Sequence, residues 1–210
     1  MAFFSLVGFT CKAQYTSEDW NDRDTWMQVP RLMALAEVGE NNKVADLGCH
    51  EGYFTFHLSE KVGDKGKVYA VDVSLYRLDD LKEHLKERAV TNVDVILGDP
   101  DDPKLPISSL DVVMLIDTYH EIRDYTTVLE KIKKALKPGG RLLILEKLKA
   151  HKKGKGREEQ ALAHTLSPKY VKQELGDAGF LVGKEVTDFG TWNHEDEKQM
   201  WVVVATKPDA

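Results

Sequence analysis

The chain has 210 residues, of which 42% are hydrophobic and 30% are charged. These values exclude a disordered chain, and the length favours one substantial domain. The formal net charge of −6 argues against a nucleic-acid partner, two cysteines cannot form a disulfide framework, and no apolar stretch reaches the ~20 residues that span a bilayer.

Residues 1–13 allow two interpretations. Small residues at Cys11 and Ala13 follow a short apolar core, which suits a signal-peptide remnant with cleavage after Ala13. However, neither Lys nor Arg precedes that core, and the segment equally fits an ordinary apolar strand or helix. The two interpretations stay open, and residues 1–13 are excluded from the fold argument.

Residues 14–40 are expected to form an N-terminal helical segment. Ser17 followed by two acids is typical of a helix start, because a hydroxyl can cap free N–H groups and acids favour the first turn. Pro30 opens a second short helix, which Gly39 closes. Since this segment leads directly into the first strand, we expect it to form a lid over the rim of the sheet.

Strands and helices alternate regularly from residue 43 onward. Five apolar runs predict strands at Lys43–Leu47, Lys67–Val73, Asn92–Leu97, Leu110–Ile116 and Arg141–Leu145. Helices are predicted from Gly52 to Lys61, from Ser74 with Leu75, Leu78, Leu81 and Leu85 on one face, from Asp124 to Leu136, and from Ser167 to Gly179. The Lys- and Gly-rich run from Lys147 to Arg157 is expected to be a solvated, mobile linker.

Two final strands, Phe180–Phe189 and Gln199–Ala205, follow one another without a helix between them. They are expected to form an antiparallel pair at one edge, whereas the alternating part predicts a parallel sheet covered on both faces. The predicted fold class is therefore α/β, with a Rossmann-like doubly wound sheet of seven strands, mostly parallel, and an antiparallel final strand. One domain is expected over residues 41–210.

The loop after the first strand reads Asp46-Leu47-Gly48-Cys49-His50-Glu51-Gly52. A glycine turn at this place lets a ligand approach the backbone and the free N–H groups of the following helix. A dinucleotide loop needs glycines at positions 48, 50 and 53, but this chain has His50 and Tyr53. The spacing therefore disfavours a nicotinamide cofactor.

Acidic residues at three strand ends suit S-adenosylmethionine (SAM), which has no pyrophosphate. Asp46 can attract its ammonium and sulfonium groups. Asp72 stands where an acid can accept both ribose hydroxyls. Asp99 ends the third strand at the same sheet rim, within reach of the adenine amino group.

From Lys43 to Lys147 the chain resembles the class I SAM-dependent methyltransferases, particularly the small type-11 group. The segments that carry the resemblance are the loop at residues 46–52, Asp72-Val73, Asp99-Pro100, the strand Leu110–Asp117 and the turn Leu136–Leu142. The resemblance implies a SAM site made by Asp46, Gly48, Cys49, His50, Gly52, Asp72, Val73, Asp99, Pro100 and Asp117. The chain departs from the family at His50, where the family usually has glycine. The His50 side chain must point away from the cofactor or contact the amino-acid head of SAM.

Reacting groups are expected just after the fourth strand, at Tyr119 and His120. His120 is the predicted general base for an acceptor that keeps its proton, and Tyr119 is predicted to wall the pocket. The alternative is that His120 is a helix-capping or packed residue. His164 lies either at the acceptor or on the polar surface. No metal-ligand spacing such as HExxH is present, so no metal is expected.

The predicted function is transfer of the SAM methyl group to a small-molecule acceptor, with SAM as the only cofactor. A nicotinamide-dependent oxidoreductase and a non-catalytic SAM-binding protein are the alternatives. SAM supply favours the cytoplasm, with export after Ala13 as the other interpretation. The sequence does not indicate an oligomeric state or identify the acceptor.

Overall fold

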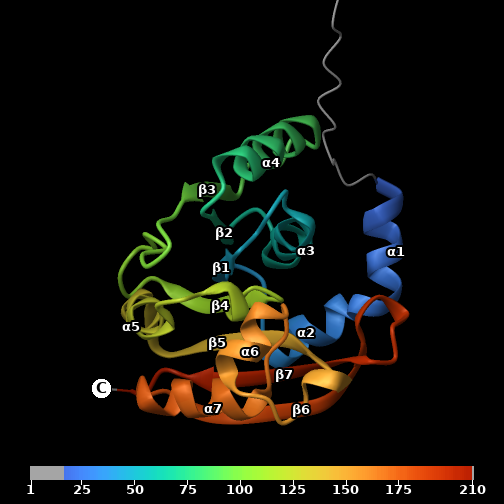
Figure 1. The fold of residues 1–210 in the computed structure, drawn as a ribbon. Coiled ribbons are helices and arrows are strands. Elements are labelled where there is room, and N and C mark those ends of the chain that lie inside the picture. Colours follow the sequence, from blue (N-terminus) through green and yellow to red (C-terminus); the bar gives the residue numbers. More distant parts are fainter. Residues whose placement is uncertain (1–16, 210) are drawn as a thin grey trace, which may run out of the picture.

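The computed structural model describes residues 17–209, so both interpretations of residues 1–13 concern a segment outside the described residues. Seven described strands form one sheet in the order β3-β2-β1-β4-β5-β7-β6 (Figure 1). The strands are β1 (Lys43–Leu47), β2 (Lys67–Asp72), β3 (Val93–Leu97), β4 (Leu110–Ile116), β5 (Leu136–Lys149), β6 (Leu181–Thr191) and β7 (Lys198–Thr206). Strands β1 to β5 run parallel, while β7 is antiparallel to both β5 and β6. The predicted fold class is confirmed.

Strand β4 shows why the central strands read as continuous apolar runs. Val112, Met114 and Ile116 lie in one core layer, and the alternating residues Val113 and Leu115 lie in the other. All five are buried, because successive side chains of a strand point to opposite faces of the sheet. A strand covered on both faces therefore needs apolar residues at every position.

Helices cover both faces of the sheet (Figure 1). The α-helices are α1 (Ser17–Met27), α2 (Val29–Ala36), α3 (Tyr53–Val62), α4 (Leu75–Glu87), α5 (Tyr125–Ala135), α6 (Arg157–Leu162) and α7 (Pro168–Asp177), and the 3-10 turns are η1 (Tyr119–Glu121), η2 (Ala150–Lys152) and η3 (Trp192–His194). Helices α2 and α3 share a core layer with Val112, whereas α5 and α7 share one with Val113. This arrangement is the doubly wound one.

The strand order reverses between β1 and β4. After β1, the chain adds β2 and β3 on one side and then crosses to β4 on the other side of β1. At such a point the connections leave in opposite directions, and a crevice opens beyond the carboxyl ends of the strands. The fold therefore places the loops after β1 and β4 side by side.

Two predictions about individual segments are wrong. Leu75 is 53% exposed, although Leu78, Leu81 and Leu85 on the same helix are buried. The first turn of α4 lies at the open rim of the sheet, where Val73 is exposed as well. The linker predicted from Lys147 to Arg157 is wrong for its first three residues, because β5 continues to Lys149 by pairing with β7.

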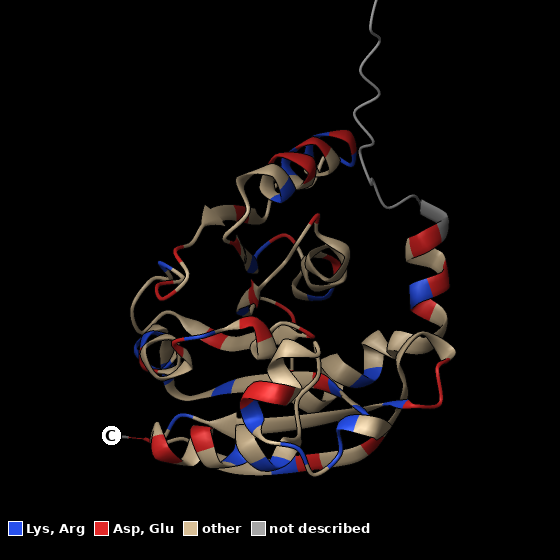
Figure 2. Ribbon diagram, viewed as in Figure 1, with Lys and Arg blue, Asp and Glu red and all other residues tan. Residues whose placement is uncertain are grey.

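The exposed helices α1, α4 and α7 carry acidic and basic residues interspersed (Figure 2). A basic stripe along a helix is the feature that marks a nucleic-acid surface, and these three helices do not carry one. Among the described residues, no helix combines the length and the apolar character that a membrane crossing requires.

Candidate functional site

A cavity of about 790 Å³ lies at the carboxyl ends of β1, β2 and β4. Its volume falls within the range of small-molecule sites. Seven residues predicted from the sequence line it: Asp46, Gly48, Cys49, His50, Asp72, Val73 and Asp117. The fold thus gathers residues from three different strand ends around one space.

Gly48 lets the loop after β1 pass close to the loop after β4. Its φ is +82°, and an added Cβ would lie 2.3 Å from the side-chain methyl group of Thr118. The N–H groups of Gly48 and Cys49 both donate to the Val71 carbonyl, at 2.8 and 3.0 Å. Only glycine satisfies both the left-handed backbone and the close approach.

Asp46 is a buried carboxylate in the cavity wall. It is 2% exposed and accepts a hydrogen bond of 2.6 Å from the Thr55 hydroxyl. Burial raises the pKa of Asp46 to about 6, against the opposing effects of the Thr55 hydrogen bond and the Arg23 charge. A cationic ligand in the cavity would compensate this buried negative charge.

Asp72 is held in place by backbone donors. The N–H groups of His50 and Ser74 each donate to one of its carboxylate oxygens, both at 2.9 Å. A carboxylate has about four acceptor positions, so each oxygen keeps capacity for a further donor. The carboxylate is therefore oriented toward the cavity loop and can still accept ligand hydroxyls.

His50 adopts the left-handed conformation that favours glycine, with φ of +53°. Its Nδ1 lies 2.5 Å from the Glu51 carboxylate, which also pairs with Arg77 at 3.2 Å. The imidazole is thus held by Glu51 at the cavity wall, and the backbone reaches the glycine-like conformation at some cost in strain.

Helix α1, which belongs to the segment expected to form a lid, and the connection between β6 and β7 supply an aromatic wall, of which the sequence did not assign the part from the β6–β7 connection. Trp20, Arg23 and Trp26 of α1 line the cavity together with Trp192. The Trp26 and Trp192 rings lie 4.8 Å apart, and the Arg23 guanidinium lies 4.3 Å from the centre of the Tyr53 ring. A tryptophan within the polar Thr191–Lys198 stretch was the available sequence signal.

Three predicted cofactor residues do not line the cavity. The Asp99 side chain is 58% exposed and pairs with Lys104 at 3.0 Å, and Pro100 is exposed beside it. An added Cβ at Gly52 would lie 2.4 Å from Leu81, so this glycine permits close packing of α3 against α4. The turn after β3 is closed on itself by backbone hydrogen bonds between Asp99 and Asp102, at 2.8 and 3.1 Å.

Tyr119 does not reach the cavity either. It is fully buried in the core layer of α5 and α7, and its hydroxyl donates to Glu174 at 2.8 Å. The predicted role as a cavity wall is wrong for this reason. The short turn η1 sends Tyr119 into the core, whereas Glu121, at its other end, lines the cavity.

A buried ionic cluster lies next to the cavity. His120 donates its backbone N–H to Glu146 at 2.9 Å, and its Nδ1 lies 2.9 Å from the same carboxylate. Lys147 Nζ lies 2.5 Å from both oxygens of Asp117. Glu146 and Lys147 were missed, because Lys147 was assigned to the linker and Glu146 had no recognisable motif around it.

The charges of this cluster shift one another's titration. Burial raises the pKa of Asp117 to about 6, with a further contribution from the charge of Glu146. Burial by itself lowers the pKa of His120, but the hydrogen bond and charge of Glu146 together with the charge of Asp117 outweigh it, and the net shift is upward. The cluster is therefore electrostatically coupled.

Comparisons with known proteins give a consistent set of matches. A family model described as a methyltransferase domain matches residues 39–195. A demethylmenaquinone methyltransferase from Lactococcus lactis is 40% identical over 129 residues, which is 60% of this chain and 50% of that protein. An aklanonic acid methyltransferase from Streptomyces is 29% identical over 53% of this chain and 51% of its own length. The chain thus spans about half the length of these curated relatives.

A solved structure gives a match over nearly the whole chain. The crystal structure of a SAM dependent methyltransferase from Aquifex aeolicus matches with a TM-score of 0.74 and 26% sequence identity. The match covers 92% of this chain and 99% of that one.

Proposed function

This chain belongs to the methyltransferase domain family, and from that premise we propose that it transfers the methyl group of SAM to a small-molecule acceptor. The observation that carries the proposal is the meeting of Asp46, the Gly48 turn and Asp72 at one cavity. SAM brings a cationic ammonium and sulfonium to the buried acid, and a ribose diol to Asp72. A dinucleotide would bring an anionic pyrophosphate toward that same acid.

Methyl transfer depends mainly on the alignment of the acceptor atom with the methyl–sulfur bond. An electron pair of the acceptor forms a bond to the methyl carbon while the carbon–sulfur bond breaks, and S-adenosylhomocysteine leaves. Positioning the two reactants in line and excluding water supply most of the rate acceleration for such a displacement. The wall that includes Trp26 and Trp192 suits an apolar or planar acceptor.

A proton on the acceptor must go to another group. The sequence assigns this role to His120, and with Nδ1 directed to Glu146 the acting atom would be Nε2. Nε2 lies 3.8 Å from the carboxylate of Glu121, which lines the cavity. His120 is thus one side chain removed from the cavity wall.

The test is calorimetric titration with SAM, S-adenosylhomocysteine and NAD. We expect both sulfur compounds to bind and NAD to give no heat. The Asp72→Ala variant should bind SAM more weakly by about 1–3 kcal/mol, because the ribose hydroxyls lose a charged acceptor. Asp94→Ala is the matched control, since Asp94 lies on the neighbouring strand and pairs with Lys67 outside the cavity.

Binding of NAD without SAM would replace the proposal with a nicotinamide-dependent enzyme. Equal SAM affinity in Asp72→Ala and the native chain, with the fold intact, would remove the ribose role from Asp72.

For the compartment, the supply of SAM favours the cytoplasm. Mass spectrometry of the protein from its native cell would test this, and an N-terminus directly after Ala13 would establish export instead.

A further inference from the structure

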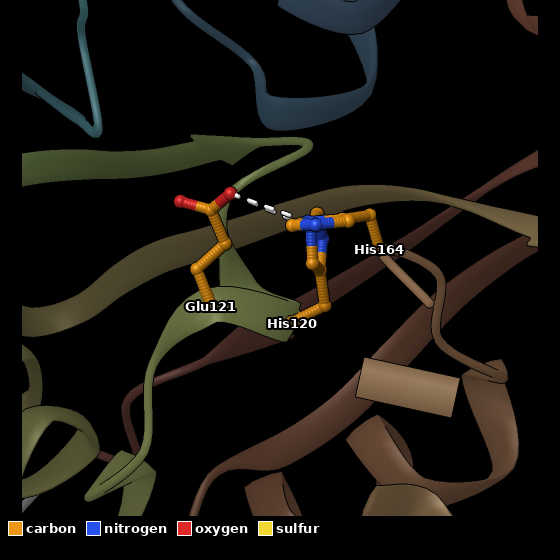
Figure 3. Close-up of side chains that lie close together, drawn as sticks. All are labelled: His120, Glu121 and His164. Atoms are coloured by element: carbon orange, nitrogen blue, oxygen red, sulfur yellow. Dashed lines mark ion pairs between the residues drawn. The ribbon is translucent and has the colours of Figure 1, made fainter. Parts of the chain in front are cut away.

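Three side chains with metal-binding atoms converge beside the cavity (Figure 3). His120 and Glu121 come from η1, and His164 comes from the connection between α6 and α7. One carboxylate oxygen of Glu121 lies 3.8 Å from His120 Nε2 and 3.7 Å from His164 Nδ1. The ligand atoms of all three lie within 4.8 Å of one another.

The Nε2 atom of His120 has no hydrogen-bond partner among the described residues, although the side chain is only 2% exposed. A buried polar atom without a partner costs free energy and calls for an explanation. The other ring nitrogen, Nδ1, lies 3.0 and 2.9 Å from the two oxygens of Glu146. This bond keeps the proton on Nδ1 and presents the Nε2 lone pair toward Glu121 and His164.

A carboxylate behind a histidine is the usual support of a metal-bound imidazole, because it fixes the tautomer and the ring orientation. Metal–ligand bonds of 2.0–2.2 Å in tetrahedral geometry place neighbouring ligand atoms ~3.4 Å apart. The observed separations of 3.7 and 3.8 Å exceed this by a few tenths of an ångström. Glu121 and His164 have side chains 62% and 70% exposed, so both can make this adjustment.

The surrounding charges favour a cation. Asp117 and Glu146 contribute two further carboxylates close to His120. Two lysines of β5 lie in the same region: Lys147 pairs with Asp117, and Lys149 donates to the Ala163 carbonyl at 2.6 Å and interacts with the Asp117 charge. The three carboxylates of Asp117, Glu121 and Glu146 outnumber the two ammonium groups, so the local charge is negative.

We propose that His120, Glu121 and His164 bind a divalent transition-metal ion, with zinc as the best match. Two imidazoles and one carboxylate form a three-ligand set that leaves a coordination position open in catalytic zinc sites. The sequence analysis expected no metal, because His164 is far along the chain from the other two ligands and no short motif spans them.

The position of the ion also indicates which class of methyl acceptor the protein uses. This inference rests on the proposed methyl transfer. Glu121 lines the cavity, so an ion bound to it would lie at the cavity wall, where a methyl acceptor could reach its open coordination position. A metal ion lowers the pKa of a bound hydroxyl. We therefore infer an acceptor with a phenol or enol hydroxyl, whose proton leaves to solvent and whose oxygen then attacks the methyl carbon. In this arrangement His120 is a ligand, and its Nε2 lone pair is not available as a base.

The test uses the full chain purified without a histidine tag and freed of metal. Calorimetry with Zn²⁺ and visible absorption with Co²⁺ should each show one equivalent bound, with the intense bands of low-coordinate Co²⁺. His164→Ala and Glu121→Gln, both at exposed side chains, should each weaken binding by at least ~10-fold. His151→Ala is the matched control, because His151 is an exposed histidine of η2 and should leave binding unchanged.

Absence of stoichiometric binding, or full binding in both His164→Ala and Glu121→Gln, would overturn the site and leave His120 as the predicted base. Catechol, as a probe hydroxyl ligand, should shift the Co²⁺ spectrum, and an unchanged spectrum would overturn the acceptor class. SAM titration of the same metal-free sample reports on the proposed function separately, since Asp46 and Asp72 do not belong to the metal set.

Discussion

Asp46 has an environment that favours ligand binding over stability. A carboxyl group whose pKa is raised to about 6 in the fold, from 3.8, binds more protons when folded than when unfolded between these two pH values. Stability therefore falls as the pH rises through this window, and the penalty is fully present above pH 6. A cationic ligand would offset it.

We expect Asp46→Asn to stabilise the ligand-free protein at pH 7.5, by on the order of 2 kcal/mol, because it removes a buried charge. The same variant should lose most SAM affinity. Urea denaturation measures the first effect, and the difference between variant and native chain should shrink as the pH falls from about 7 to 5. A variant that is less stable at pH 7.5 and binds SAM normally would contradict this account.

His50 gives a second prediction at the residue scale. Replacing it by glycine relieves a left-handed residue, a gain of up to about 1 kcal/mol, but removes the contact with Glu51. We expect stability to be unchanged or slightly higher, and SAM affinity to be retained. Ala89→Gly is the control, because Ala89 has the same φ of 53° and does not line the cavity.

Thermal denaturation and SAM titration of the two glycine variants check this. A large loss of SAM affinity in His50→Gly alone would show that the imidazole contacts the cofactor directly.

At the scale of elements, α1 is anchored at one end and lies at the cavity with the other, as expected of a lid. Its C-terminal end is anchored in the core by Trp26 and Met27, and Gln28 breaks the helix with a φ of +51° before α2 begins. Farther from this break, Trp20 is half-buried against Phe56 at the cavity. The lid expected from the sequence would therefore be α1 alone, moving about Gln28 while α2 stays in the core.

If α1 closes on the cofactor, tryptophan fluorescence should change when SAM is added. Most of the change should disappear in Trp20→Phe, because within α1 Trp20 lies farther from the anchored end than Trp26 does. Trp201→Phe should keep it, since Trp201 is buried in the core layer of α5 and α7. The same fluorescence change in native chain and Trp20→Phe would show that α1 does not respond to the cofactor.

For the whole molecule, cofactor binding should appear as added stability. A ligand at 100 times its dissociation constant stabilises the folded state by about 2.7 kcal/mol. For a domain of this size that corresponds to a rise in Tm of roughly 5–10 °C. We expect this rise with S-adenosylhomocysteine at saturation and none with NAD, measured by differential scanning calorimetry. Equal shifts with both compounds would point to a general nucleoside site.

Much of the fold and part of the site were determined by the sequence alone. The bounds of β1 and β4 agree with the predicted strands at both ends, because a buried parallel strand is a continuous apolar run closed by turn residues. The loop from Asp46 to Gly52 and the acid at Asp72 were recognisable for the same reason. Strand ends and turns depend on residues close together in the chain.

Only the tertiary structure decided the partners. His120 meets Glu146 across 26 residues, Asp117 meets Lys147 across 30, and Tyr119 meets Glu174 across 55. Which end of η1 turns into the core, at Tyr119, and which lines the cavity, at Glu121, depends on the order of strands in the sheet. Which histidine lies beside Glu121 depends on where α6 and α7 pack. Local propensity contains no information about such pairs, because their free energy arises only once distant segments exclude water together.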